Sequence, residues 1–190
     1  VPTRVAHSHS VSQDKNLKYP IKLWYKRFIS KYATDLFACG KDAGDWMFGG
    51  VPFQTINNAI DVAAYTYDPA KRQKVRRQLG LENEFTIGHV GRFNQPKNHP
   101  FLLEIFAALL KKEPNAVLLL VGGGEDMPKI QAKARTLGIA EHVRFLGVRS
   151  DVADLMQAMD VFVFPSLYEG LPVTMVEEHA AGLPCLISDK

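Results

Sequence analysis

Short apolar runs alternate with helical patterns over residues 85–190, and this alternation constrains the fold more than any other feature of the sequence. Successive runs are separated by ten or more residues, enough for a helix that returns the chain to a parallel strand. The runs are almost continuously apolar, as expected of strands that are covered on both faces. We therefore predict an α/β fold with an open, doubly wound parallel sheet. Its strands are expected in FTIGHVGRF, AVLLLVGGG, VRFLG, DVFVFP and PCLIS.

Helical patterns fill the connections between these strands. Pro114 should end the first helix, and Gly138 follows the second, as is common at helix C-termini. Ser150 is the expected N-cap of the third, because its hydroxyl can accept a hydrogen bond from the first turn. The helices are predicted over HPFLLEIFAALLKKEP, about Met127–Leu137, SDVADLMQAM and PVTMVEEHAAG.

The first 84 residues repeat this order less regularly. Strands or extended segments are expected at 4–10, 35–40 and 53–61, and helices at 20–33, 41–49 and 68–80. We predict that residues 1–84 form the tail of one α/β domain with a linker, and residues 85–190 most of a second. The chain has no initiating Met and stops just after a strand, so we expect a fragment that is truncated at its C-terminus.

Composition excludes several classes of protein. The chain is 46% hydrophobic and 23% charged, which is typical of a globular protein and excludes dominant disorder. Cys39 and Cys185 are too few and too far apart for a disulfide scaffold, and they fit a reducing compartment. No apolar run reaches the roughly 18–20 residues that span a bilayer, and the N-terminus has no secretory apolar region. A cytoplasmic location is therefore expected.

Basic residues concentrate in the region 15–33, although the net charge of +3 is too small to indicate nucleic-acid binding. Apolar and aromatic residues recur there at helical spacing, which predicts an amphipathic helix with a basic face. Two interpretations remain open: a helix packed on a core with a solvated outer side, or a peripheral contact with an anionic membrane surface. The apolar positions are Ile21, Trp24, Tyr25, Phe28, Ile29 and Tyr32.

In doubly wound sheets, ligands bind beyond the carboxyl ends of the strands. One segment there, GGG at 122–124, partly fits a dinucleotide-binding fingerprint, but Met127 stands where a third small residue is needed. A tight turn with positive φ is the alternative interpretation. In GRFNQPKN, Gly91 permits a turn, and Arg92 and Lys97 flank a short loop in which two cations can hold a diphosphate. Exposed cations in a polar loop are the plainer alternative.

The segment PSLYEGLPVTMVEEHAAG combines a loop carboxylate with a helix start. Glu169 lies in the loop, Gly170 permits a sharp turn, and Pro172 suits the first helical position. Free backbone N–H groups around Leu171–Thr174 could then bind a phosphate. Glu177 follows Glu169 by eight residues and could reach another part of the same ligand, or it could be a helix-surface charge.

Glu169-x₇-Glu177, with FVFPSLYEG before it and AAGLPCLIS after it, resembles the signature of retaining group 1 (family 4) glycosyltransferases. The segments GRF…KN, VGGG, VRFLG and MDVFVFPS follow in the family's order, and bacterial exopolysaccharide and capsule enzymes are the most similar in character. The resemblance implies the GT-B fold, two Rossmann-like domains facing a cleft. INNAID at 56–61 is similar to the family's interdomain IPNGID, with Asn57 and Ala59 as departures. AHSHS at 6–10 is similar to a strand end in its acceptor domain.

The resemblance also implies residue roles. Arg92 and Lys97 would bind the donor's diphosphate in place of a metal ion, and Glu177 would accept hydrogen bonds from the ribose. His9, or His7 if the local alignment slips, would touch the donor sugar from the acceptor domain, and Glu169 would contact the transferred sugar. The remaining donor-binding residues implied are Gly91, Arg149, Gly170, Leu171, Pro172 and Val173.

The implied reaction transfers a glycosyl residue from a nucleotide diphospho-sugar, with uridine expected, to a glycan or lipid-linked acceptor hydroxyl, with retention of configuration. No cofactor, metal or nucleic acid is expected, and the fragment alone should be inactive. Two alternatives remain: a nucleotide-sugar epimerase of similar fold, and a noncatalytic nucleotide-sugar-binding subunit. The remaining histidines carry no metal-ligand spacing and no expected role; they are His89, His99, His142 and His179.

Overall fold

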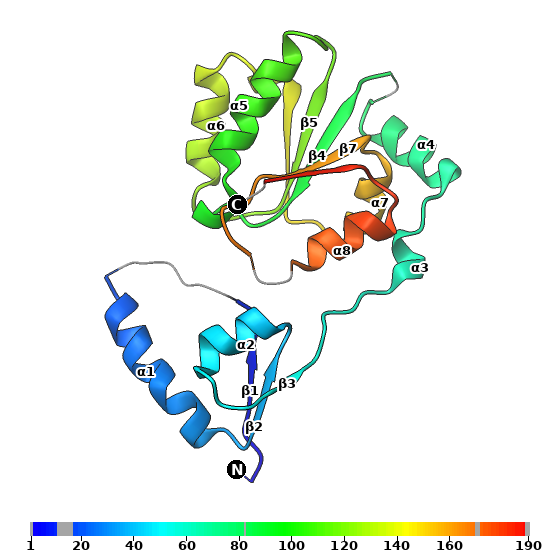
Figure 1. Cartoon of the computed structure of the whole chain (residues 1–190). Coiled ribbons are helices and arrows are strands. Elements are labelled where there is room, and N and C mark those ends of the chain that lie inside the picture. Colours follow the sequence, from blue (N-terminus) through cyan, green and yellow to red (C-terminus); the bar gives the residue numbers. More distant parts are fainter. Residues whose placement is uncertain (1, 11–16, 82, 170–171, 189–190) are drawn as a thin grey trace. The chain divides into compact units, whose positions relative to one another are not determined.

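The computed structural model describes residues 2–10, 17–81, 83–169 and 172–188. The chain forms two compact units. One comprises Val1–Ala59 with Tyr168–Val173, and the other comprises Ile60–Leu167 with Thr174–Lys190. Figure 1 shows the elements of each unit.

The first unit contains a small parallel sheet in the order β1-β2-β3. β1 and β2 pair in register from Val5↔Asp35 to Ser8↔Ala38, and α1 and α2 occupy the two connections. A small core forms around Phe48, and the Ser8 hydroxyl donates to the Ala43 carbonyl at 2.7 Å. The elements are β1 (Val5–Ser8), α1 (Tyr19–Tyr32), β2 (Asp35–Ala38), α2 (Lys41–Phe48) and β3 (Gln54–Thr55).

Helix α1 leaves much of its apolar face exposed. Trp24 and Tyr25 are each more than half exposed, and Trp24 packs edge-to-face on Phe28 with ring centroids 4.9 Å apart. Ile29 packs against the small core, and the Lys26 ammonium lies 4.2 Å from the centroid of the Trp46 ring. The aromatic residues line a hollow of about 510 Å³. None of the described helices is both long and apolar enough to cross a bilayer.

The second unit contains a five-stranded sheet in the order β6-β5-β4-β7-β8, with every strand pair parallel. This confirms the predicted doubly wound sheet. The order reverses between β4 and β7, because the chain first builds outward through β5 and β6 and then returns to the other side of β4. The elements are α3 (Val62–Tyr65), α4 (Pro69–Gln78), β4 (Thr86–Val90), a 3₁₀ turn (Gln95–Lys97), α5 (His99–Leu110), β5 (Val117–Val121), α6 (Met127–Thr136), a second 3₁₀ turn (Ala140–His142), β6 (Val143–Gly147), α7 (Val152–Gln157), β7 (Val161–Phe164), α8 (Val173–Ala180) and β8 (Cys185–Ile187).

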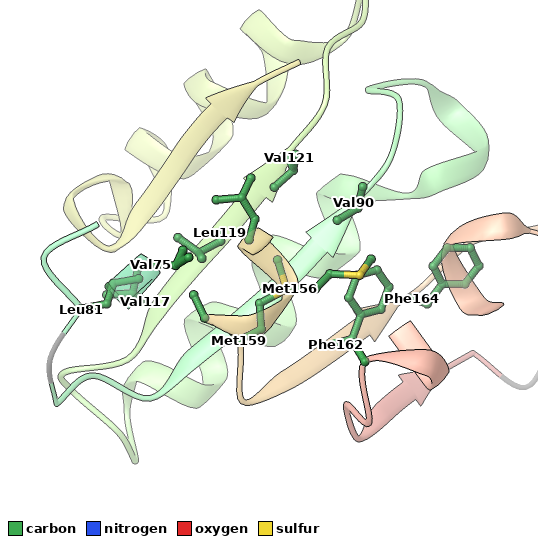
Figure 2. Close-up of a cluster of buried hydrophobic side chains, with 13 residues drawn as sticks. Val75, Leu81, Val90, Val117, Leu119, Val121, Met156, Met159, Phe162 and Phe164 are labelled. Carbon is green, nitrogen blue, oxygen red and sulfur yellow. The ribbon is translucent and has the colours of Figure 1, made fainter. Parts of the chain in front are cut away.

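Alternate residues of β5 serve two separate cores, which explains why its sequence is continuously apolar. Leu118 and Leu120 pack with α5 and α6 on one face. Val117, Leu119 and Val121 pack on the other face with α4, α7 and the aromatic residues of β7 (Figure 2). Both faces of the sheet are therefore covered by helices, as Figure 1 also shows.

Residues 60–84, which the sequence pattern assigned to the first part and its linker, pack on the second unit. The reason is an ion-pair network at the start of β7. Arg72 pairs with Asp160 and donates to the carbonyls of Gln157 and Met159 at 2.9 and 2.7 Å. The nearly buried Arg76 donates to the carbonyl of Ala158 at 2.8 Å and lies 3.4 Å from Asp160. These cations line a hollow of about 760 Å³, but protein oxygens already engage them, so their role is structural.

The start of α7 differs from the prediction. Asp151, not Ser150, occupies the N-cap, and its side chain makes no capping hydrogen bond. Arg149 binds the Asp151 carboxylate instead, which removes the capping acceptor. Helix α8 begins at Val173, one residue after the expected first position at Pro172.

Replacing Asp160 with Ala should destabilise the fold by about 1.5–3 kcal/mol, because it removes a charged acceptor from Arg72, Arg76 and the Thr86 N–H. Asp154→Ala is the matched control, since the Asp154 pair with Lys71 is solvent-exposed and should contribute about 0.5 kcal/mol at most. Urea unfolding measures both free energies. Equal losses in the two variants would contradict the structural role of the network.

Candidate functional site

The reversal of strand order between β4 and β7 brings two loops together at the carboxyl ends of these strands. The Leu167 N–H donates to the Pro96 carbonyl at 2.8 Å, and the Asn98 side chain donates to the Pro165 carbonyl at 3.2 Å. Asn98 adopts a left-handed conformation with φ of 50°, which Asn tolerates better than most residues. The loop after β4 and the loop after β7 therefore form one connected structure at the position where such sheets bind ligands.

Lys97 lies at the centre of this structure. Its ammonium sits 4.6 Å from the centroid of the Phe164 ring, at the end of β7, in a cation–π contact. Gly91 makes room for the Lys97 side chain: a Cβ atom at Gly91 would lie 3.2 Å from Lys97 Cε and 3.1 Å from His89 Nε2. The turn at Gly91 thus serves to let a cation lie against the strand ends.

Arg92 contacts a different partner. Its guanidinium Nη2 lies 3.2 Å from Oε2 of Glu125, in the loop after β5, and both side chains are about 70% exposed. Pairs this exposed contribute little free energy, so a stronger acceptor such as a phosphate can replace Glu125. Arg92 and Lys97 belong to the same loop, but their charged groups contact separate partners here.

The glycines at 122–124 let the loop after β5 approach the loop after β4. The Phe93 N–H donates to the Gly123 carbonyl at 2.9 Å. Gly122 and Gly124 have φ of 136° and 154°, and a Cβ at either would lie within 2.4 Å of a backbone oxygen of Gly91 or Phe93. The tight turn with positive φ is confirmed, and close backbone packing explains this triplet without a bound dinucleotide.

Two buried histidines support the loop from behind, although the sequence assigned them no role. His89 Nδ1 lies 2.8 Å from the Val163 carbonyl, and the His99 ring stacks on Phe93 with centroids 4.1 Å apart. Burial lowers the pKa of His89 to about 3 and that of His99 to about 4, with Lys97 adding to both shifts. Both rings are therefore neutral at pH 7. A histidine inside an apolar strand was the signal that could have found His89.

Glu177 lies on α8, and its carboxylate is held by a residue that the sequence did not indicate. The Tyr65 hydroxyl donates to Glu177 Oε1 at 2.7 Å. Burial, followed by the bond to Glu177, raises the pKa of Tyr65 to about 12, so the phenol stays a donor. No local pattern could reveal this contact, because 112 residues separate the two positions.

Arg149 follows β6, which β5 separates from β4 in the sheet. Its Nε and Nη2 atoms bind the two carboxylate oxygens of Asp151 at 2.8 and 2.6 Å. This bidentate contact lowers the pKa of the Asp151 carboxyl. The guanidinium is exposed at the carboxyl end of its strand, on a different loop from Arg92 and Lys97.

The remaining expected residues belong to the first unit or are not described. His9 is exposed after β1, with its ring 4.1 Å from that of His7; burial and then the neighbouring His9 lower the pKa of His7. Glu169 and Pro172 are half-buried and Val173 is exposed, all in the segment assigned to the first unit. The expected backbone donors Gly170 and Leu171 lie outside the described residues.

A metal site has no support in the part of the chain that the structure describes. Across residues 2–10, 17–81, 83–169 and 172–188, no three side chains of the His, Cys, Asp or Glu type gather as metal ligands would. The loop after β4 instead carries the cations Arg92 and Lys97, which suit an anionic ligand.

Comparison with known proteins identifies similar chains. Residues 71–190 match the family model described as glycosyl transferases group 1. The putative glycosyltransferase EpsF of Bacillus subtilis is 39% identical over 100% of this chain and 52% of its own length. The UDP-Gal:alpha-D-GlcNAc-diphosphoundecaprenol alpha-1,3-galactosyltransferase of Escherichia coli is 27% identical with the same coverage. The chain thus spans about half the length of these relatives.

Among solved structures, Anabaena Alr3699/HepE in complex with UDP-glucose superimposes with a TM-score of 0.85. The two sequences are 25% identical, and the match covers 98% of this chain and 53% of that protein. The expected fold class, Rossmann-like units of the GT-B type, is confirmed by this similarity together with the two parallel sheets.

Replacing His89 with Asn should make stability less sensitive to acid. In the unfolded chain, His89 binds a proton near pH 6.5, whereas in the folded state its pKa is about 3. The free energy of unfolding therefore falls as the pH drops through this window. Asn retains a donor near the Nδ1 position but does not titrate. Between pH 6 and 5, the free energy of unfolding should lose about 1 kcal/mol less in the variant than in the parent chain. Identical slopes in urea titrations would contradict the neutral, buried state of His89.

Proposed function

Because the chain belongs to the group 1 glycosyltransferases, we propose that it carries the donor site of an enzyme that transfers a glycosyl residue from a nucleotide diphospho-sugar to an acceptor hydroxyl. The observation that carries this proposal is the cationic loop at the strand reversal, where Lys97 is held against Phe164 and Arg92 makes an exchangeable pair. Residues 1–84 would then comprise the acceptor-side part and the linker, with the linker from residue 60 packed on the donor domain of residues 85–190.

The diphosphate would bind Arg92 and Lys97. Arginine offers a planar fork of donors and lysine a compact charge, which together suit two adjacent phosphates. Breaking the Arg92–Glu125 ion pair costs little free energy, because both side chains are exposed. His89 and His99 are neutral, so they exert no charge repulsion on the Lys97 ammonium. These two cations would take the place of a metal ion.

The nucleoside would bind through Glu177 and Arg149. A carboxylate accepts hydrogen bonds only, which matches the two hydroxyl donors of a ribose. We propose UDP as the nucleotide, since the similar Anabaena protein was solved with UDP-glucose and the Escherichia coli relative is named for UDP-Gal. The acceptor named for that relative is a diphosphoundecaprenol lipid, which supports a lipid-linked or glycan acceptor in cell-envelope or extracellular polysaccharide synthesis.

Departure of the diphosphate is the demanding step, because negative charge grows on the leaving oxygen while the sugar becomes oxocarbenium-like. Arg92 and Lys97 would stabilise that charge, together with backbone N–H groups of Gly170 to Val173. Glu169 and His9 would orient the sugar. Front-face attack would retain the configuration, with the acceptor proton passing to the leaving phosphate. The intact protein would perform this reaction in the cytoplasm.

Removing either cation should weaken binding of UDP. Arg92→Ala and Lys97→Ala should each raise the Kd for UDP by about 10–100-fold, the value of a hydrogen bond between charged groups. Isothermal titration in EDTA measures the Kd and tests independence from metal at the same time. Arg135→Ala is the control, because Arg135 is an exposed cation on α6 outside the loop.

An unchanged Kd in both variants would refute the diphosphate assignment, and loss of binding in EDTA would refute metal independence. Incubating the intact protein with UDP-sugars separates the alternatives. A transferred sugar with retained configuration supports the proposal, an epimerised donor supports an epimerase, and binding without turnover supports a noncatalytic subunit.

We also propose that α1 makes a peripheral contact with anionic membrane. Trp24, Tyr25 and Tyr32 are more than half exposed, and lysines and an arginine occupy the same helix. Such a combination of exposed aromatic rings and cations is typical of helices that lie in a membrane interface. A lipid-linked acceptor would be presented at that surface.

Reversing two charges on α1, with Lys22→Glu and Arg27→Glu together, should weaken binding to phosphatidylserine vesicles. Each cation near an anionic surface contributes about 1 kcal/mol, so the vesicle partition coefficient should fall by at least about 30-fold at low salt. Lys111→Glu with Lys112→Glu, on the second unit, is the control. Vesicle co-sedimentation that is absent in the parent chain, or equal in both double variants, would exclude α1 as the contact.

A further inference from the structure

Tyr65 and Glu177 come from distant parts of the chain but meet in the second unit. Tyr65 is the last residue of α3, and Glu177 lies within α8. The Tyr65 hydroxyl donates to Glu177 Oε1 at 2.7 Å. Both side chains are half-buried, so the bond is partly shielded from water and the carboxylate keeps an accessible side.

The backbone of Tyr65 is fixed by a buried amide. Gln157, which is 2% exposed, donates from Nε2 to the Tyr65 carbonyl at 2.9 Å. Its Oε1 accepts from the Asp68 N–H at 3.0 Å, so the amide bridges the last residue of α3 and the N-cap of α4. The Tyr65 ring also packs against the core formed with α4 and α7. Tyr65 is therefore held by the core and by Gln157, in addition to its bond to Glu177.

The Tyr65 hydroxyl uses only one of the hydrogen-bond acceptor sites of the Glu177 carboxylate. An ionised carboxylate has about four lone-pair sites on two oxygens, and Tyr65 uses one of them on Oε1. The remaining sites can accept the two hydroxyls of a ribose. The last side-chain torsion of Glu177 has broad energy minima, so the torsion alone does not fix the orientation of the carboxylate. The hydrogen bond from the phenol restrains that rotation.

We propose that Tyr65 is a positioning residue that holds the Glu177 carboxylate in the orientation that receives the ribose hydroxyls of the nucleotide donor. This inference rests on the proposed role of Glu177. Tyr65 itself does not touch the reacting atoms, and its contribution is to donor affinity through the ribose, not to the departure of the diphosphate.

The test compares UDP with 2′,3′-dideoxy-UDP, which lacks the hydroxyls that Glu177 would bind. Tyr65→Phe removes one oxygen and should raise the Kd for UDP by about 5-fold while leaving the Kd for the dideoxy analogue unchanged. In a Glu177→Ala background, Tyr65→Phe should have no further effect on either ligand, since the carboxylate it positions is gone. Tyr67→Phe is the matched control, because Tyr67 is an exposed tyrosine two residues away.

Each other outcome overturns the inference in a distinguishable way. If Glu177→Ala weakens UDP binding and Tyr65→Phe does not, Tyr65 has no positioning role and the proposed function stands. Equal losses for UDP and the dideoxy analogue, or an additive loss in the double variant, would mean that Tyr65 acts on the fold instead. If Glu177→Ala leaves UDP binding unchanged, the proposed role of Glu177 itself fails.

Discussion

The direction in which the chain leaves β4 determines where this protein can bind a ligand. From β4 the chain builds β5 and β6 on one side of the sheet and β7 and β8 on the other. The loops after β4 and β7 are hydrogen-bonded to each other at the carboxyl ends of these strands, where such sheets bind ligands. Lys97, from the loop after β4, contacts Phe164, the last residue of β7, at this position.

The loops at this position are held by backbone contacts and neutral groups. The glycines at 122–124 allow N–H to carbonyl bonds between the loops after β4 and β5, and Asn98 ties the first loop to the end of β7. His89 and His99 are buried beneath these loops as uncharged rings, so they do not repel the cations Arg92 and Lys97. A preorganised loop of this kind loses little entropy when an anion binds.

Local patterns predicted the second sheet well and the contacts between distant segments poorly. Apolar runs such as that of β5 and stop signals such as Pro114 and Gly138 act over a few residues, so the sequence located the strands, most helix ends and the positive-φ turn at Gly122. The N-cap was wrong because Arg149 captures the Asp151 carboxylate, a competition that propensity does not report. Tyr65 and the packing of α4 were missed because their partners, Glu177 and Asp160, lie 84 or more residues away.

The residues of the candidate site likewise came partly from the sequence and partly from the structure. Family resemblance assigned Arg92, Lys97 and Glu177, whereas the structure adds what surrounds them: Glu125, Phe164, His89 and Tyr65. The proposed function requires a nucleotide diphosphate to bind at the β4–β7 reversal. A crystal structure of the protein with UDP tests it most directly. We expect phosphate oxygens within hydrogen-bond distance of Arg92 and Lys97, the Arg92–Glu125 pair opened, and the ribose on Glu177. Well-ordered UDP bound elsewhere, with that pair intact, would contradict it.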